Sequence, residues 1–100
     1  MSEDRASTTL HVLNKSPQHP RVRECLEQLA GNDGLLLMEN AVMMLTTDDW
    51  LSNLPRGVAL SVLEPDMAMR GITVPTDGIT VTDYGGFVRM VCQWPRTIHW

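Results

Sequence analysis

The residues best suited to chemistry are a cysteine and two basic side chains that lie close together in the sequence. Cys25 is one of only two cysteines in the chain, Arg21 precedes it by four positions and His19 by six. The thiolate is the reactive form of cysteine, and a nearby positive charge favours it. Four residues apart on a helix, Arg21 and Cys25 would share one face. The segment therefore suggests a reactive thiol at Cys25, with Arg21 as its stabilising charge and His19 as an assisting group.

A packing role explains the same cysteine without chemistry. Val22, Cys25, Leu26 and Leu29 recur at the spacing of one apolar helical face. A free cysteine on such a face commonly acts as a small hydrophobic residue. Both interpretations of Cys25 stay open at this point.

The remaining sulfur and imidazole groups do not form a motif. Cys92 falls late in a predicted helix, where the negative end of the helix dipole disfavours a thiolate, so we expect a structural role for it. His11 lies within a predicted strand and is expected to be a satisfied, partly buried histidine. No C-x-x-C pair and no spacing typical of zinc ligands occurs, so neither a metal nor a cofactor is expected.

Apolar segments that alternate with helical patterns must position these groups. Short apolar and β-branched runs predict four strands, and amphipathic or capped segments between them predict helices. This alternation indicates a mostly parallel sheet with helices on both faces, an α/β fold whose chemistry would gather beyond the carboxyl ends of the strands. The expected strands span 8–13, 34–38, 57–64 and 78–83, and the expected helices or helical turns span 20–30, 39–46, 48–54, 65–71 and 84–94.

Composition limits the class of protein. The chain has 100 residues, of which 43% are hydrophobic, and a net charge of -4. This size fits one domain, expected over residues 10–100, after a polar and flexible segment over residues 1–9. The acidic balance argues against direct nucleic-acid binding, and no apolar run is long enough to span a bilayer. No phosphate-binding glycine motif occurs, and without a signal-like start we expect a cytoplasmic protein.

Six segments in register resemble the TusB/DsrH family of sulfur-relay proteins, from about Leu10 to Trp100. None of them is decisive alone, but together they cover nearly the whole chain. They are "LHVLNKSP" (10–17), "CLEQL" (25–29), "GLLLMENAV" (34–42), "LEPDMAMRG" (63–71), "ITVTDYGGFV" (79–88) and the last residue, Trp100.

The resemblance implies a small three-layer DsrE-like fold and a role as one subunit of a cytoplasmic heterohexamer. Its partners would be a DsrE/TusD-like and a DsrF/TusC-like subunit, with two copies of each chain. Such complexes hand persulfide sulfur to a small DsrC/TusE-like carrier protein. The sulfur serves either 2-thiolation of the wobble uridine in tRNA or dissimilatory sulfur oxidation.

The resemblance also bears on Cys25, because DsrH-type members carry a cysteine at the equivalent helix and several TusB-type members lack it. This match favours the sulfur-oxidation branch. The main active cysteine of these complexes, however, lies on the DsrE or TusD subunit. Two hypotheses follow: Cys25 is itself a persulfide carrier of a sulfurtransferase complex, aided by Arg21 and His19, or the chain is a non-catalytic subunit that completes the complex and shapes the docking surface of the carrier.

Overall fold

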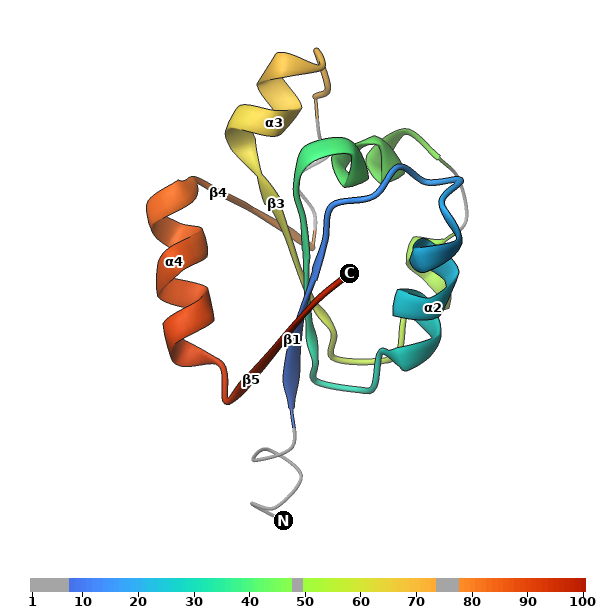
Figure 1. Ribbon diagram of the computed structural model, residues 1–100, viewed down its shortest axis with the longest axis vertical. Coiled ribbons are helices and arrows are strands. Elements are labelled where there is room, and N and C mark those ends of the chain that lie inside the picture. The colour runs from blue at the N-terminus through green and yellow to red at the C-terminus, as the bar shows by residue number, and fades with distance from the viewer. Residues whose placement is uncertain (1–7, 48–49, 74–77) are drawn as a thin grey trace.

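The computed structural model describes residues 8–47, 50–73 and 78–100 and shows one five-stranded parallel sheet (Figure 1). The strand order is β4-β3-β2-β1-β5, and every neighbouring pair is parallel. The strands are β1 (Thr9–Leu13), β2 (Gly34–Leu37), β3 (Ala59–Leu63), β4 (Ile79–Thr82) and β5 (Arg96–His99). The predicted parallel α/β architecture is confirmed.

Helices cover both faces of this sheet. Helix α2 lies on one face and α4 on the other, so the molecule has three layers (Figure 1). The α-helices are α2 (Pro20–Gln28), α3 (Glu64–Met69) and α4 (Tyr84–Gln93), and the 3-10 helices are η1 (Glu39–Thr46) and η2 (Leu51–Asn53). Of the predicted helical segment 48–54, residues 48–49 lie outside the described residues, as does the expected flexible start of the chain up to residue 7.

The central strands are buried because both of their faces are covered. All residues of β1 and β2 are buried, which explains the continuous apolar run "GLLL". The odd-numbered residues of these strands pack in the core beneath α2, and the even-numbered ones pack beneath α4. The α2-side core contains Leu13, Leu35, Leu37, Leu60 and Val62 with Val22, Cys25 and Leu29, and the α4-side core contains Leu10, Val12 and Leu36 with Phe87, Met90, Val91 and Trp94.

Side-chain caps begin the two long helices at the predicted positions. His19 Nδ1 accepts a hydrogen bond from the Arg21 amide at 3.0 Å, and Pro20 occupies the first helical turn. Asp83 Oδ1 accepts from the Gly86 amide at 2.8 Å at the start of α4. Helix α2 ends at Gln28, two residues before the predicted end of the helix at residue 30.

The sheet has a fifth strand in addition to the four predicted ones. Strand β5 follows Pro95 and is short, and its outer residues Arg96 and His99 are exposed, so it has no apolar pattern of its own. It forms by pairing with β1, where Leu10 lies opposite Thr97 and Val12 opposite His99. Strand β1 is therefore flanked on both sides, and the residue after β5 reaches the carboxyl end of β1.

The predicted buried face of α4 was partly wrong. The apolar spacing over 84–94 predicts a core face of Tyr84, Phe87, Val88 and Val91, but Tyr84 and Val88 are 55% and 58% exposed. Cys92, for which a structural role was expected, is exposed as well. The core side of α4 is formed by Phe87 and Val91 together with Met90 and Trp94. Two apolar stripes overlap on this helix, and periodicity alone does not say which one meets the sheet.

Gly86 allows α4 to approach the sheet closely. It is the buried glycine of α4, and a Cβ atom there would collide with the Thr82 side chain. We predict that Gly86→Ala lowers the free energy of unfolding, because overpacking costs about 1 to 3 kcal/mol and exceeds the gain of at most about 1 kcal/mol from helix propensity. Denaturant unfolding of Gly86→Ala in the wild-type and Thr82→Ala backgrounds tests this. The substitution should become neutral or stabilising once the Thr82 hydroxyl and methyl groups are gone; equal destabilisation in both backgrounds would contradict the contact.

Candidate functional site

The strand order reverses direction at β1. The chain proceeds from β1 through β2 and β3 to β4, and α4 then returns it across the opposite face to β5 on the other side of β1. In open parallel sheets, ligands bind beyond the carboxyl ends of the strands at such a reversal. In this chain Trp100 follows β5 and lies at the carboxyl end of β1.

Trp100 is held at this position by its backbone and by its ring. Its amide donates to the Val12 carbonyl at 2.9 Å, and its carbonyl accepts from Lys15 Nζ at 2.7 Å. The indole N–H donates to His11 Nδ1 at 3.0 Å, and the two rings stack with centroids 6.1 Å apart. The Arg21 guanidinium lies over the Trp100 ring, 5.7 Å from its centroid. The protein's own side chain therefore occupies the reversal point of the sheet.

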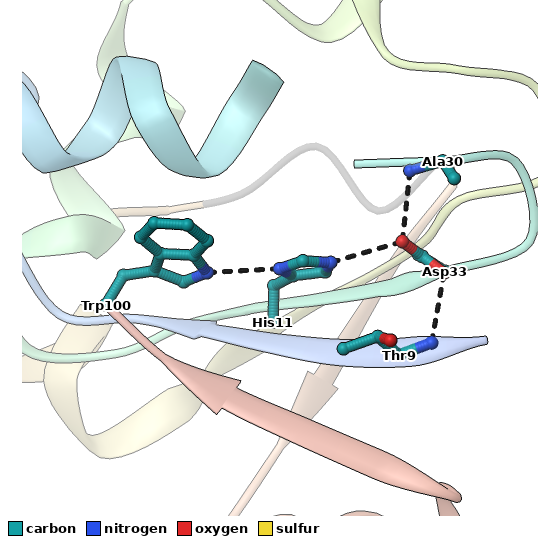
Figure 2. Close-up of polar contacts among 5 residues, drawn as sticks. All are labelled: Thr9, His11, Ala30, Asp33 and Trp100. Atoms are coloured by element: carbon teal, nitrogen blue, oxygen red, sulfur yellow. Dashed lines mark hydrogen bonds and ion pairs between the residues drawn. The ribbon is translucent and has the colours of Figure 1, made fainter. Parts of the chain in front are cut away.

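A buried carboxylate completes this arrangement (Figure 2). Asp33 Oδ1 accepts from the Thr9 amide at 3.0 Å, while Oδ2 accepts from the Ala30 amide at 3.0 Å and faces His11 Nε2 at 3.1 Å. An indole N–H can only donate, so His11 Nδ1 must accept the bond from Trp100. The proton of the neutral imidazole therefore lies on Nε2 and is donated to Asp33.

The Asp33–His11 pair has the form of a catalytic acid–histidine pair without its third member. In hydrolases the free ring nitrogen faces a nucleophilic hydroxyl or thiol. Here that nitrogen faces the Trp100 indole, and His11 is only 2% exposed. The pair joins β1, the start of β2 and the residue after β5, which is a structural role. The expectation that His11 is satisfied is confirmed, but its side chain is fully buried and not partly buried, and its partner Asp33 was not foreseen.

Cys25 lies in the core beneath α2. Its side chain is 0% exposed and packs in the same apolar cluster as Val22 and Leu29. Burial away from water raises the pKa of the Cys25 thiol from 9.0 to about 12. At neutral pH the thiol is therefore protonated and out of reach of a solute in this conformation.

The two basic residues predicted to assist Cys25 are directed elsewhere. Arg21 is exposed, forms an ion pair with Glu24 at 3.0 Å and lies over the Trp100 ring. His19 is exposed and its Nδ1 caps α2. The three residues of the predicted site are therefore near one another in sequence, but the structure does not bring their functional groups together.

His19 instead lines an open groove beside α2. The groove has a volume of about 890 Å³, and its lining is shared by α2, the loop before it and the end of η1. Apolar contributions come from Val22, Leu26 and Met44, and charged ones from Arg23 and Glu27; Cys25 is not part of the lining. The groove offers a surface for contact with another molecule and does not expose the thiol.

The described ranges contain neither a metal site nor a membrane-spanning helix. No group of three His, Cys, Asp or Glu side chains there is placed to hold a metal ion. None of the helices in that part of the chain has the length and apolar character needed to cross a membrane.

The burial of Cys25 predicts a large difference in reactivity between the two thiols. A rise in pKa from 9.0 to about 12 lowers the thiolate fraction about a thousandfold, and the apolar cover adds a steric barrier. With iodoacetamide under native conditions, the exposed Cys92 should be alkylated while Cys25 stays protected until the chain is unfolded. Peptide mass spectrometry over time measures both rates, with Cys92→Ser and Cys25→Ser as matched controls. Alkylation of Cys25 as fast as in the unfolded chain would contradict the buried placement.

The comparisons with known proteins agree with the fold and with the resemblance found in the sequence. A family model described as "DsrH like protein" matches residues 15–96. The crystal structure of the ychN protein from E. coli matches with a TM-score of 0.62 and 16% sequence identity, covering 93% of this chain and 98% of that chain, and it shows a shared fold. No curated protein matches this chain. On the family match across most of its length, the chain belongs to the DsrH-like family of sulfur-relay proteins.

Proposed function

We propose that this chain is a non-catalytic subunit of a cytoplasmic sulfur-relay complex, in which the cysteine of a partner subunit carries the sulfur. The observation that carries this proposal is the burial of Cys25. Its thiol is 0% exposed, and its pKa is raised to about 12 by desolvation. The chain then contributes surface and shape to the complex while the exchange takes place elsewhere.

Persulfide exchange makes demands that Cys25 does not meet. A thiolate must attack the terminal sulfur of a donor, and the acceptor thiol must later reach the same sulfur. Both steps need a deprotonated sulfur that is accessible to a second protein. Exposing Cys25 would require α2 to leave the sheet and would uncover Val22 and Leu29 as well. That loss of apolar burial opposes a transfer role for Cys25.

Cys92 does not replace Cys25 as a carrier. It is exposed, but it lies in the last turn of α4, where the negative end of the helix dipole disfavours a thiolate. Neither cysteine of this chain therefore has the environment of an exchange thiol.

Exposed apolar side chains support a role within an assembly. Tyr84 and Val88 are one turn apart on α4, and both are more than half exposed. Apolar side chains grouped on a surface are typical of contact sites between proteins. We propose that related DsrE/TusD-like and DsrF/TusC-like subunits cover such surfaces in a heterohexamer with two copies of each chain, and that a DsrC/TusE-like carrier docks on it.

The pathway is proposed from the family resemblance. Cys25 matches the cysteine of DsrH-type members, so we favour dissimilatory sulfur oxidation over 2-thiolation of tRNA wobble uridine. In this proposal Cys25 is a packing feature of that branch, and it is not itself persulfidated.

Substitution of Cys25 in the assembled complex tests the proposal. Because Cys25→Ala removes only a buried side chain, sulfur transfer from a persulfide donor to the carrier should stay within about twofold of wild type, while the melting temperature falls as expected for a small cavity. Intact-mass measurement of each subunit follows the sulfur, and native mass measurement checks the assembly. Cys92→Ala is the matched control and should behave like wild type. Loss of transfer in Cys25→Ala with assembly preserved, or a sulfur gained by this chain at Cys25, would overturn the proposal.

A further inference from the structure

Both nitrogens of the buried His11 ring are already engaged. Nε2 donates to Asp33 at 3.1 Å, and Nδ1 accepts from the Trp100 indole at 3.0 Å (Figure 2). His11 is 2% exposed and Asp33 is 5% exposed, so the bond between them is shielded from water, whereas the bond to the half-buried Trp100 is partly buried. The hydrogen bond to Trp100 exists only while Nδ1 carries no proton.

Protonation of His11 would leave one of these two bonds and remove the other. An imidazolium has an N–H donor at each nitrogen, and an indole N–H has no acceptor capacity. Two donors would then face each other at the position where His11 and Trp100 now share a bond. The bond to Asp33 would be strengthened, because a carboxylate is a better partner for an imidazolium than for a neutral ring. The hydrogen bond between His11 and Trp100 is therefore the one that is lost.

The two cations near the His11 and Trp100 rings also favour a docked tryptophan beside a neutral histidine. Arg21 on α2 places its guanidinium over the Trp100 ring, and Lys15 after β1 binds the Trp100 carbonyl. Each cation stabilises the docked tryptophan, and each repels a positive charge on His11. Helix α2 carries four more titratable groups: Cys25 is buried and neutral, Glu24 is paired with Arg21, and Arg23 and Glu27 line the open groove. On β5, Arg96 pairs with Thr9 and is on the same sheet face as His11, whereas His99 pairs with Val12 and is on the opposite face.

We propose that Trp100 is a proton-sensitive latch at the reversal point of the sheet: it is docked while His11 is neutral, and its indole is released when His11 takes up a proton. Release uncovers His11 and the carboxyl end of β1, the position at which parallel sheets of this kind bind ligands. This inference does not depend on the sulfur-relay proposal, because it concerns only the contacts of this chain.

Fluorine NMR of the full chain labelled with 5-fluorotryptophan tests the latch. The chain has three tryptophans, so three resonances are expected, and the Trp100 resonance is identified by its absence in Trp100→Phe. On titration from about pH 8 to about pH 5, the range in which histidines change charge, the Trp100 resonance should acquire the solvent isotope shift of an exposed indole. The Trp50 and Trp94 resonances should stay in place.

Two histidine variants on the neighbouring strands β1 and β5 distinguish the latch from an overall effect of low pH on the fold. His11→Gln keeps an amide donor for Asp33 and a carbonyl acceptor for Trp100 but does not titrate, so its Trp100 resonance should be independent of pH. His99→Gln removes a titrating group next to Trp100 that takes no part in the proposed bonds, and its response should equal that of wild type.

A reciprocal measurement keeps the test valid if His11→Gln does not fold. In Trp100→Phe the opposing indole N–H is absent, so the His11 ring protons should titrate at higher pH, corresponding to a roughly tenfold gain in proton affinity for one lost hydrogen bond. A Trp100 resonance that stays fixed while His11 titrates would overturn the latch. Movement of all three tryptophan resonances together, or unchanged His11 titration in Trp100→Phe, would overturn it as well.

Discussion

The buried carboxylate of Asp33 is the constraint on which the centre of this molecule depends. A buried charge is costly unless hydrogen bonds surround it. Asp33 meets this requirement with donors from three places: the amide of Thr9 in β1, the amide of Ala30 after α2, and the ring of His11. These bonds fix how α2 leads into β2 and how β2 lies beside β1. Through His11 the same group also sets the position of Trp100, so a single side chain links the sequence neighbourhood of α2 to the opposite end of the chain.

This constraint explains why the candidate cysteine is enclosed. Helix α2 is held at its start by the His19 cap and after its end by the bond between Ala30 and Asp33. Between these two points its apolar face must lie on the sheet, and Cys25 is on that face. A helix tied at both ends cannot expose one central residue without breaking bonds at an end or losing its core contacts. The geometry that gives the fold its compact core thus removes the thiol from exchange chemistry.

Local patterns in the sequence predicted most of the fold but not its long-range contacts. The first four strands, the starts of α2 and α4 and the family resemblance depend on residues within short segments, and all were confirmed. Strand β5 has only a weak local pattern and forms because β1 offers a free edge, so it was missed. Which side of α4 is exposed depends on which of its two apolar stripes packs against Leu10 and Leu36 in the sheet, and this long-range contact has no local signal. The sequence contains one signal for Asp33, since it is an acidic residue directly before a fully apolar strand. Its partner His11, however, is 22 positions away and cannot be identified from a local pattern.

A family cysteine and a working thiol are distinct properties, and the structure separates them. The family resemblance concerns which residue stands at position 25, whereas persulfide transfer depends on the ionisation and accessibility of that residue. Among the described residues, the two groups that were expected to assist the thiol serve other partners: Arg21 lies over Trp100, and His19 caps α2. Lys15, a further cation nearby, binds the Trp100 carbonyl. The positive charge near α2 therefore stabilises the docked tryptophan and not a thiolate. In the proposed complex, this arrangement favours a division of labour in which a partner subunit provides the reactive sulfur and this chain provides a closed surface beside it.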